Sequence, residues 1–382
     1  MKPRILISDG ANKNTLAIIR NLGRYYSFDV LTPFPLPLTL SAYSKFSNNI
    51  FQVNVSKEAE YYLDILSILK DKNYDVFLPV GLKSYLVASK YRDKFLKYTS
   101  LLVPEWEAMK IAYNKDLTME LAKKLGIPTP RTMILTSSNL PSIKEFPVVI
   151  KSSDESGAYV KYCNTPEELK RNYNYLRKKS TTNIIAQEYI KGFGTGFYGV
   201  CKRGKLYAVF MHRRIKEFPI TGGPSAVAEA YYNKKLFNYG RKICKKLKWD
   251  GPLMAEFKYS QERDEYYLIE LNPKLWGSLD LTIKAGINVP EILIRLALGE
   301  KVKPVKTYKK VKFRWVFPDE FKVLMSGGET LKEFFRRELH TYTNLDFSDP
   351  LPTLFQIVRG VTEGFWIVVD KKKRFPHGVV KV

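Results

Sequence analysis

The chain has 382 residues, of which 45% are hydrophobic and 26% are charged, a composition that suits a globular protein of two or three domains. Apolar runs stay well short of the ~20 residues that a membrane-spanning helix needs, and the N-terminal segment lacks the apolar stretch of a signal peptide, so we expect a cytoplasmic protein without a membrane span. The formal net charge of +25 would suit an anionic partner, such as nucleic acid, an acidic protein, an anionic lipid or a phosphorylated ligand, but a solvated lysine-rich surface is the favoured explanation.

The first 105 residues alternate the patterns of strands and helices. Strands are expected at 4–8, 28–31 and 76–80, and helices at 15–22 and 58–69. This rhythm is typical of βαβ units around a parallel sheet. The first turn, Asp9-Gly10-Ala11-Asn12, does not match GxGxxG and so does not indicate a dinucleotide site. We therefore expect an N-terminal α/β domain over residues 1–105.

Residues 106–310 are expected to form a second domain, and residues 311–382 a small C-terminal segment of unassigned role. The second domain has helical patterns at 114–125, 165 onward, 236–247 and 290–299, and strand patterns at 147–151 and 184–190. A glycine-rich turn is expected at 192–199. In the C-terminal segment the sequence predicts a helix at 331–339 and a strand at 365–369.

The stretch 253–279 is the most informative part of the chain. It predicts two strands joined by a polar turn at 260–264, with carboxylates inside apolar runs. Strand side chains alternate, so Glu270 and Asn272 point the same way, and Glu256 on the partner strand could meet them. Two carboxylates and an amide oxygen make a hard-oxygen site of the kind that holds Mg²⁺ with nucleotide phosphates. The alternative is a half-exposed hairpin with solvated glutamates.

The order of several short motifs supports a family resemblance. Lys115 begins a helix and Lys151 ends a strand, and these are followed by a polar loop, the strand IAQEYI, a Glu-bearing strand and the segment ELNP. This order resembles the ATP-grasp superfamily, whose nucleotide lies between two α+β subdomains, and the resemblance covers residues 3–300. The segments MHRRIKEFPITGGPS and NPKLWGSLDLTIKAGINVP are similar to the branch of predicted carboxylate–amine ligases.

The resemblance implies a set of ligand-binding residues. The lysines would contact nucleotide phosphates, because ammonium groups are compact positive charges. The strand IAQEYI, which resembles the family's hinge between the two subdomains, would bind adenine through its backbone. A loop after Lys151 would cover the phosphates. Glu256, Glu270 and Asn272 would ligate Mg²⁺, with two ions expected and Mn²⁺ as an alternative metal. The predicted nucleotide contacts are Lys115, Lys151, Ser153, Gly157, Gln187, Glu188, Tyr189 and Ile190.

Two positions depart from the family pattern. Many relatives have an acidic residue for the ribose hydroxyls four positions after Ile190, where this chain has Gly194, so the ribose contact is unassigned. The phosphate-covering loop, residues 152–157, contains one glycine and two carboxylates instead of several glycines. An ordinary acidic turn is the alternative for this loop.

A second group of candidates lies around residues 211–225. Alternation places His212 and Arg214 on one face of a strand, and we expect Arg214 to contact a phosphate or carboxylate. A structural role is favoured over a role as a base for His212. The glycine pair at 222–223 permits positive φ, so this loop could close over a substrate. Lys274 follows the metal ligands where relatives often have Arg, and we expect it to face the reacting groups.

The resemblance implies an ADP-forming ATP-grasp carboxylate–amine ligase. A substrate carboxylate, free or carried on a protein, would attack the γ-phosphorus of ATP to give an acyl phosphate, and an amine would displace phosphate to form an amide. Another ATP-grasp outcome, such as carboxyl-phosphate or thioester formation, stays open. So does a non-catalytic protein of the same fold that binds nucleic acid or an acidic carrier. A homodimer is the default expectation.

Overall fold

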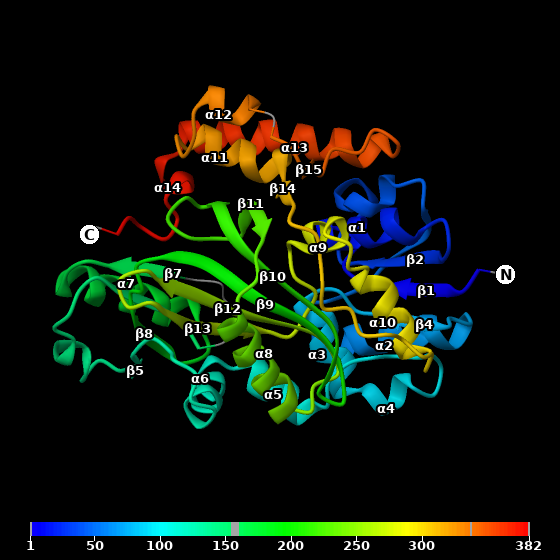
Figure 1. Ribbon diagram of the computed structural model, residues 1–382, viewed down its shortest axis with the longest axis horizontal. Coiled ribbons are helices and arrows are strands. Elements are labelled where there is room, and N and C mark those ends of the chain that lie inside the picture. The colour runs from blue at the N-terminus through cyan, green and yellow to red at the C-terminus, as the bar shows by residue number, and fades with distance from the viewer. Residues whose placement is uncertain (1, 154–159, 337, 381–382) are drawn as a thin grey trace.

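The computed structural model describes residues 2–153, 160–336 and 338–380, which form three sheets with helices packed around them (Figure 1). The N-terminal sheet is parallel, with strand order β3-β2-β1-β4. Its strands are β1 (Arg4–Ile7), β2 (Ser27–Thr32), β3 (Ser47–Gln52) and β4 (Val76–Leu78). Its helices are α1 (Lys13–Leu22), α2 (Glu58–Asp71), α3 (Leu82–Lys90) and α4 (Arg92–Phe95), with short 3₁₀ turns η1 (Leu36–Leu38) and η2 (Leu40–Tyr43). The predicted parallel sheet is confirmed, and β3 is a strand that the sequence did not reveal.

A small lobe contains a four-stranded antiparallel sheet of order β5-β8-β6-β7. Its elements are β5 (Thr132–Leu135), η3 (Leu140–Ser142), β6 (Val148–Ser152), β7 (Val160–Cys163), α7 (Pro166–Lys179) and β8 (Ile184–Glu188). Helix α7 begins as the sequence predicts, because the Thr165 side chain accepts a hydrogen bond from the Glu168 backbone N–H and Pro166 occupies the first turn. The lobe has its own apolar core between α7 and the sheet.

The third sheet has seven strands in the order β13-β12-β9-β10-β11-β14-β15. These are β9 (Phe193–Lys202), β10 (Lys205–Glu217), β11 (Ser225–Ala230), β12 (Gly251–Ser260), β13 (Glu265–Asn272), β14 (Lys312–Arg314) and β15 (Thr341–Thr343). The helices of this region are α5 (Trp106–Tyr113), α6 (Lys115–Lys124), α8 (Lys234–Lys246), α9 (Leu279–Lys284) and α10 (Val289–Ala297). Two apolar cores on this sheet continue into the N-terminal sheet, so the two units share buried side chains.

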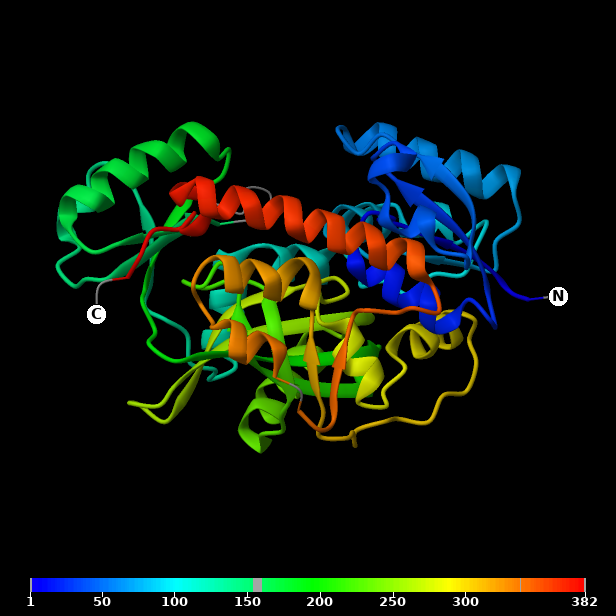
Figure 2. The same cartoon turned by 90° about the horizontal axis from the view of Figure 1, so that it is seen from above.

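The C-terminal residues extend the large sheet and then form a helical layer. β14 pairs with β11 and with β15, and the chain continues through η4 (Val316–Glu320), α11 (Phe321–Met325), α12 (Leu331–Phe335), α13 (Pro350–Val369) and α14 (Lys371–Arg374). Figure 2 shows α13 lying across the molecule between the small lobe and the N-terminal sheet. Among the described helices, none combines the length and the apolarity that crossing a bilayer requires.

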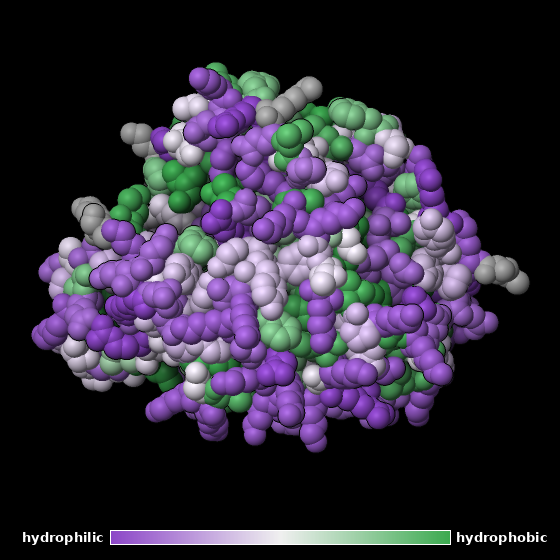
Figure 3. All heavy atoms as spheres, viewed as in Figure 1, coloured by the Kyte–Doolittle hydropathy of each residue, from purple (hydrophilic) through white to green (hydrophobic). Residues whose placement is uncertain are grey.

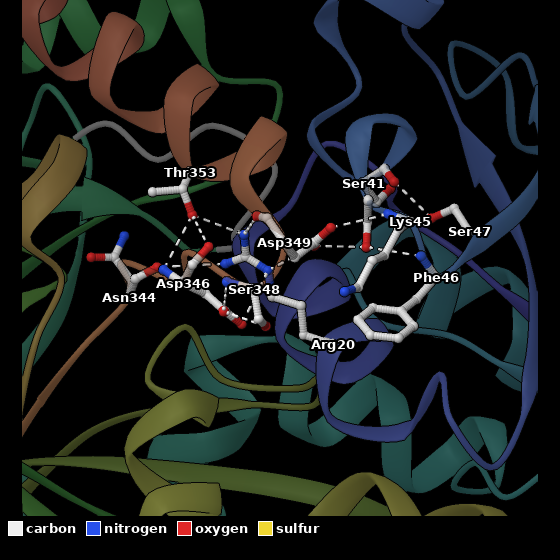
Figure 4. A network of polar contacts seen from close by, with 11 residues as sticks. Arg20, Ser41, Lys45, Phe46, Ser47, Asn344, Asp346, Ser348, Asp349 and Thr353 are labelled. Carbon is white, nitrogen blue, oxygen red and sulfur yellow. Dashed lines mark hydrogen bonds and ion pairs between the residues drawn. The ribbon is translucent and has the colours of Figure 1, made fainter.

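Polar contacts fasten both ends of this layer. At the start of α13, the buried Asp349 carboxylate accepts hydrogen bonds from Arg20 of α1 at 3.0 Å and from Ser44 at 2.9 Å (Figure 4). After α14, the backbone carbonyl of His377 accepts a hydrogen bond from Tyr162 of β7 at 2.9 Å. The C-terminal segment therefore connects the N-terminal unit to the small lobe.

Two sequence predictions were wrong, and one helix was predicted too long. Residues 192–199 are not a glycine-rich turn, because most of them belong to β9, between β12 and β10. A Cβ at Gly196 would lie 2.8 Å from the Tyr198 hydroxyl oxygen, so this glycine makes room inside a strand. Residues 365–369 are the last turns of α13 and not a strand, because packing of Gly364 against Phe321 outweighs the β propensity of the local sequence. The helix predicted at 331–339 ends at Phe335.

Candidate nucleotide and metal site

A cavity of 690 Å³ lies between the small lobe, the large sheet and the N-terminal unit. The small lobe contributes β6, β7 and β8, and the large sheet contributes residues of β10, β12 and β13. The N-terminal unit contributes residues 12–14, at the start of α1, and 80–82, after β4. A cavity of this size between lobes is the usual place for a small-molecule ligand.

The three predicted metal ligands lie together on the cavity wall. Glu256 of β12 pairs with Glu270 of β13 in the antiparallel register, and Asn272 is two residues further along the same face. The Asn272 side-chain N–H donates to the Glu270 carboxylate at 2.9 Å. In the described part of the chain no cluster of three His, Cys, Asp or Glu side chains suits a metal. A cation here would therefore use two carboxylates, an amide oxygen and oxygens from its ligand.

Two buried lysines face these carboxylates. Lys115 and Lys151 are each only 6% exposed, and the Lys115 ammonium lies 3.8 Å from the Glu270 carboxylate. Asn114 caps α6 with its side-chain oxygen, and the Lys115 backbone N–H donates to the Ser153 carbonyl at 2.9 Å. This bond ties the start of α6 to the end of β6, so the two lysines enter one cavity from different elements.

Burial and neighbouring charges shift the pKa values of this group. Burial lowers the pKa of Lys151 to about 8, although Glu270 opposes the shift. Burial alone would raise the pKa of Glu270, but the charges of Lys115 and Lys151 outweigh it and leave the pKa below its usual value. Glu270 is therefore ionised near neutral pH, and Lys151 is mostly charged but close to its titration range. Such paired perturbations are typical of functional sites.

The hinge residues line the same cavity at the end of β8. The buried Gln187 side chain donates to the Thr132 hydroxyl at 3.0 Å. The Glu188 carboxylate accepts from Arg263 at 2.6 Å, and its backbone N–H donates to the Arg131 carbonyl at 2.9 Å. Tyr189 and Ile190 follow the strand end. The backbone after β8 therefore lies along the cavity.

Arg214 of β10 is a mostly buried cationic side chain on the same sheet as the predicted metal ligands. Its guanidinium lies 2.7 Å from the Glu256 carboxylate and 3.3 Å from the Glu217 carboxylate, and it donates to the Gly223 carbonyl at 3.1 Å. Burial would lower the pKa of Arg214, but the two carboxylates raise it above its usual value, so it stays charged. A Cβ at Gly194 would lie 2.7 Å from the Glu217 carboxylate and 2.9 Å from Arg214 Cδ. Glycine at position 194, where many relatives have an acidic residue, therefore leaves room for the Arg214–Glu217 ion pair.

His212 has a different environment from Arg214, although both side chains line the cavity. Its ring is almost fully buried, stacks on Tyr198 with centroids 4.6 Å apart, and forms a 2.7 Å hydrogen bond with the Ser278 hydroxyl. Burial, and then the charge of Arg214, lower the pKa of His212 to about 3. The neutral imidazole holds the loop that contains Ser278, as a structural role requires. Lys274 lies on that loop and lines the cavity.

Three residues that line the cavity were not predicted from the sequence, and one predicted residue lies outside the described part of the chain. Ser153 is buried at the end of β6, whereas Gly157 belongs to the undescribed residues 154–159. Asn12, Lys13 and His377 line the cavity. No local motif indicated them, because they approach from the N-terminal unit and from the C-terminal tail.

Sequence comparisons place this architecture among known proteins. A family model described as "ATP-grasp in the biosynthetic pathway with Ter operon" matches residues 180–317. The chain is 23% identical to urea amidolyase of Lachancea kluyveri over 272 residues, which cover 65% of the chain and 15% of that protein. It is also 23% identical to carbamoyl-phosphate synthase of Methanobrevibacter smithii over 279 residues, covering 69% and 73%. The chain thus spans a small part of the first relative and most of the second.

Solved structures share the fold. The biotin carboxylase domain of Hydrogenobacter thermophilus 2-oxoglutarate carboxylase, crystallised with MgADP and bicarbonate, gives a TM-score of 0.63 at 17% identity, covering 80% of this chain and 72% of that one. L-amino acid ligase from Bacillus licheniformis gives 0.62 at 14% identity, covering 80% and 75%. The similarity at these identities concerns the fold. The chain therefore shares the fold of these two structures and resembles the ATP-grasp superfamily, whose family model matches residues 180–317.

Proposed function

We propose that this protein is an ATP-dependent, ADP-forming carboxylate–amine ligase. It activates a substrate carboxylate as an acyl phosphate and joins it to an amine, releasing ADP and phosphate. The observation that carries the proposal is the meeting of Glu256, Glu270 and Asn272 with two buried lysines in one cavity. An anion-binding protein without catalysis has no use for carboxylates inside its anion site.

The nucleotide is proposed to lie between the small lobe and the large sheet. The backbone at Glu188 and Ile190 would bind adenine, and Lys115 and Lys151 would bind the phosphates. The Glu256, Glu270 and Asn272 side chains would hold Mg²⁺. When bound there, Mg²⁺ neutralises charge on the phosphate oxygens during phosphoryl transfer. The fit of this site rests on the hard-oxygen donor set and on the partial exposure of both carboxylates to the cavity.

The carboxylate and amine would occupy the other end of the cavity. Arg214 would bind the carboxylate and then the acyl phosphate, because its guanidinium is charged and faces the cavity. Lys274 and the loop at 221–225 would close this end, where Gly222 has a φ of +127° that glycine adopts readily. Residues 12–14 and 80–82 would contact the amine. Holding both reactants away from water would supply much of the rate.

Each of the three proposed parts of the chain would have its own role in this arrangement. Residues 1–105 would help to bind the acceptor, and residues 106–310 would bind ATP and carry out the chemistry. Residues 311–382 would hold the two together through α13 and the tail contact to β7.

An ADP-release assay with ATP, Mg²⁺ and pooled amino acids tests the proposal, with mass spectrometry of the product. Amine-dependent ADP release and a new amide support it. Bicarbonate-dependent ADP release without amine would favour carboxyl-phosphate chemistry, which the similarity to a carbamoyl-phosphate synthase keeps as the second candidate. Salt-sensitive binding of nucleic acid without any turnover would contradict an enzymatic role.

A further inference from the structure

Helix α13 carries an apolar stripe along its outer face. Eight large apolar side chains of this helix are each 50% to 60% exposed: Leu351, Leu354, Val358, Val361, Phe365, Trp366, Val368 and Val369. In Figure 3 hydrophobic side chains gather at the top of the molecule, where Figure 1 places α12 and α13, and Figure 2 shows the outer side of α13 facing the viewer along its length. We refer to these eight residues as the α13 stripe.

The opposite face of α13 is already packed. Gly360 and Gly364 let the helix approach the body closely, since a Cβ at either position would meet Phe317 or Phe321 within 2.7 Å. Ile367 and Pro352 are buried on the same side. A helix that is apolar on both faces is typical of a buried element, whereas a surface helix has a polar outer face. The sequence of α13 is therefore that of a helix with a second partner.

The spacing of the stripe indicates what kind of partner fits. Leu351, Leu354, Val358, Val361, Phe365 and Val368 follow one another at intervals of three, four, three, four and three residues. This 3.5-residue period is the pattern of a seam between two helices. A helix lying in a membrane surface needs no such period, and it carries many basic residues on its polar face. Within α13, Arg359 is the only basic residue.

The area and the end charges fit a second copy of this chain. The eight side chains expose about half of their surface, an area on the order of 800 Å² in total. This area matches what each partner contributes to a standard protein interface. In an antiparallel pair the start of one α13, which follows the acidic Asp346, lies beside the end of the other α13, which precedes the basic helix α14. The Asp346 side chain is 38% exposed and Lys373 is exposed, so the two ends that come together carry opposite charges.

We propose that the α13 stripe is the interface of a homodimer in which the two α13 helices pack antiparallel. This surface lies outside the nucleotide cavity, and the proposal does not depend on the proposed ligase activity. In an antiparallel pair the positive end of each helix dipole also lies beside the negative end of the other, which is a favourable interaction.

Sedimentation velocity of the whole chain over a wide concentration range, at about 0.15 M salt where charge repulsion is screened, tests this proposal. We expect a dimer for the natural chain and a monomer for the double variant Val358→Glu/Val361→Glu. Leu63→Glu is the matched control, because Leu63 of α2 has the same exposure as the stripe residues, and it should remain dimeric. A natural chain that stays monomeric at about 100 µM, or a dimer that persists in the double variant, would overturn the proposal.

A second measurement covers the case in which the double variant fails to fold. Val358→Cys/Val361→Cys should form intermolecular disulfides on mild oxidation, because these positions face each other across the proposed seam. The natural Cys163, Cys201 and Cys244 are buried and should not compete. Leu63→Cys is the control and should stay uncrosslinked. Absence of crosslinks in the double variant, or binding of a monomeric natural chain to phosphatidylserine vesicles through the stripe, would assign the surface to another occupant and contradict the dimer.

Discussion

The Arg214 guanidinium lies 2.7 Å from the Glu256 carboxylate, so a cationic side chain pairs with one of the proposed metal ligands. A divalent cation bound to Glu256 would compete with this ion pair. Release from Glu256 would leave the Arg214 guanidinium able to bind the substrate carboxylate or the acyl phosphate. The Glu217 carboxylate, 3.3 Å away on the other side, would keep Arg214 at the site during that exchange.

Arg214→Ala tests this exchange. We expect ADP release to fall by about 100-fold or more, because a charged group that acts on the transition state is lost. Binding of Mn²⁺ in the absence of nucleotide should instead become tighter, because the competitor for Glu256 is gone. Electron paramagnetic resonance of free Mn²⁺ measures this affinity. Arg213→Ala is the control, because Arg213 lies on the exposed side of β10 and pairs with Glu229. Weaker Mn²⁺ binding in Arg214→Ala would contradict the exchange.

The pKa of Lys151 predicts a pH dependence of nucleotide binding. Its pKa of about 8 in the free protein would rise when a triphosphate binds, because the phosphates favour the ammonium form. ATP affinity should therefore be constant below about pH 7.5 and should fall by up to tenfold per pH unit above pH 8. Isothermal titration calorimetry between pH 6.5 and 9.5 measures the profile.

Lys151→Arg supplies the control for this profile. Arginine remains charged throughout the range, so any residual ATP binding in this variant should lose the decline above pH 8. The same decline in Lys151→Arg would assign the titration to another group.

Glu270→Gln tests the predicted metal ligand whose carboxylate lies 3.8 Å from the Lys115 ammonium. We expect ADP release to fall by about 100-fold or more, because a neutral amide binds Mg²⁺ much less well than a carboxylate. Glu265→Gln on the same strand is the control, since Glu265 pairs with Lys235 outside the cavity and should retain activity. Circular dichroism should show that both variants keep the fold. Natural turnover in Glu270→Gln would remove this residue from the catalytic machinery.

Asp349→Ala tests how the C-terminal layer is held. The substitution leaves the Arg20 guanidinium, which is mostly buried, without its closest carboxylate. Loss of one partner from a buried pair is costly, so we expect the free energy of unfolding in urea to fall by about 3 kcal/mol. Asp346→Ala should change it by less than about 1 kcal/mol, because Asp346 is more exposed and lies 3.9 Å from Arg20. Equal effects of the two substitutions would contradict the assignment of Asp349 as the anchor.

Local patterns were sufficient for the elements whose side chains alternate or repeat regularly. The parallel N-terminal sheet and the β12–β13 hairpin followed from such patterns, and the register of Glu256 with Glu270 is as expected. Asn114 and Thr165 cap helices at the positions where the helical patterns of the sequence begin. These features depend on neighbouring residues along the chain, which explains why one sequence can reveal them.

Features that depend on distant partners could not be predicted. β9 contains several glycines and looks like a turn, but Tyr198 and the Arg214–Glu217 pair fill the space beside its glycines. β14 and β15 pair in parallel across a long connection, for which no local signal exists. The bond between His212 and Ser278 joins two elements 66 residues apart.

A crystal structure with Mn²⁺ and a non-hydrolysable ATP analogue would locate the metal and the nucleotide together. We expect an anomalous Mn²⁺ peak about 2.0–2.3 Å from oxygens of Glu256, Glu270 and Asn272, with the triphosphate against Lys115 and Lys151. A nucleotide bound elsewhere, or Mn²⁺ held by the phosphates without any of these three side chains, would contradict the proposed site.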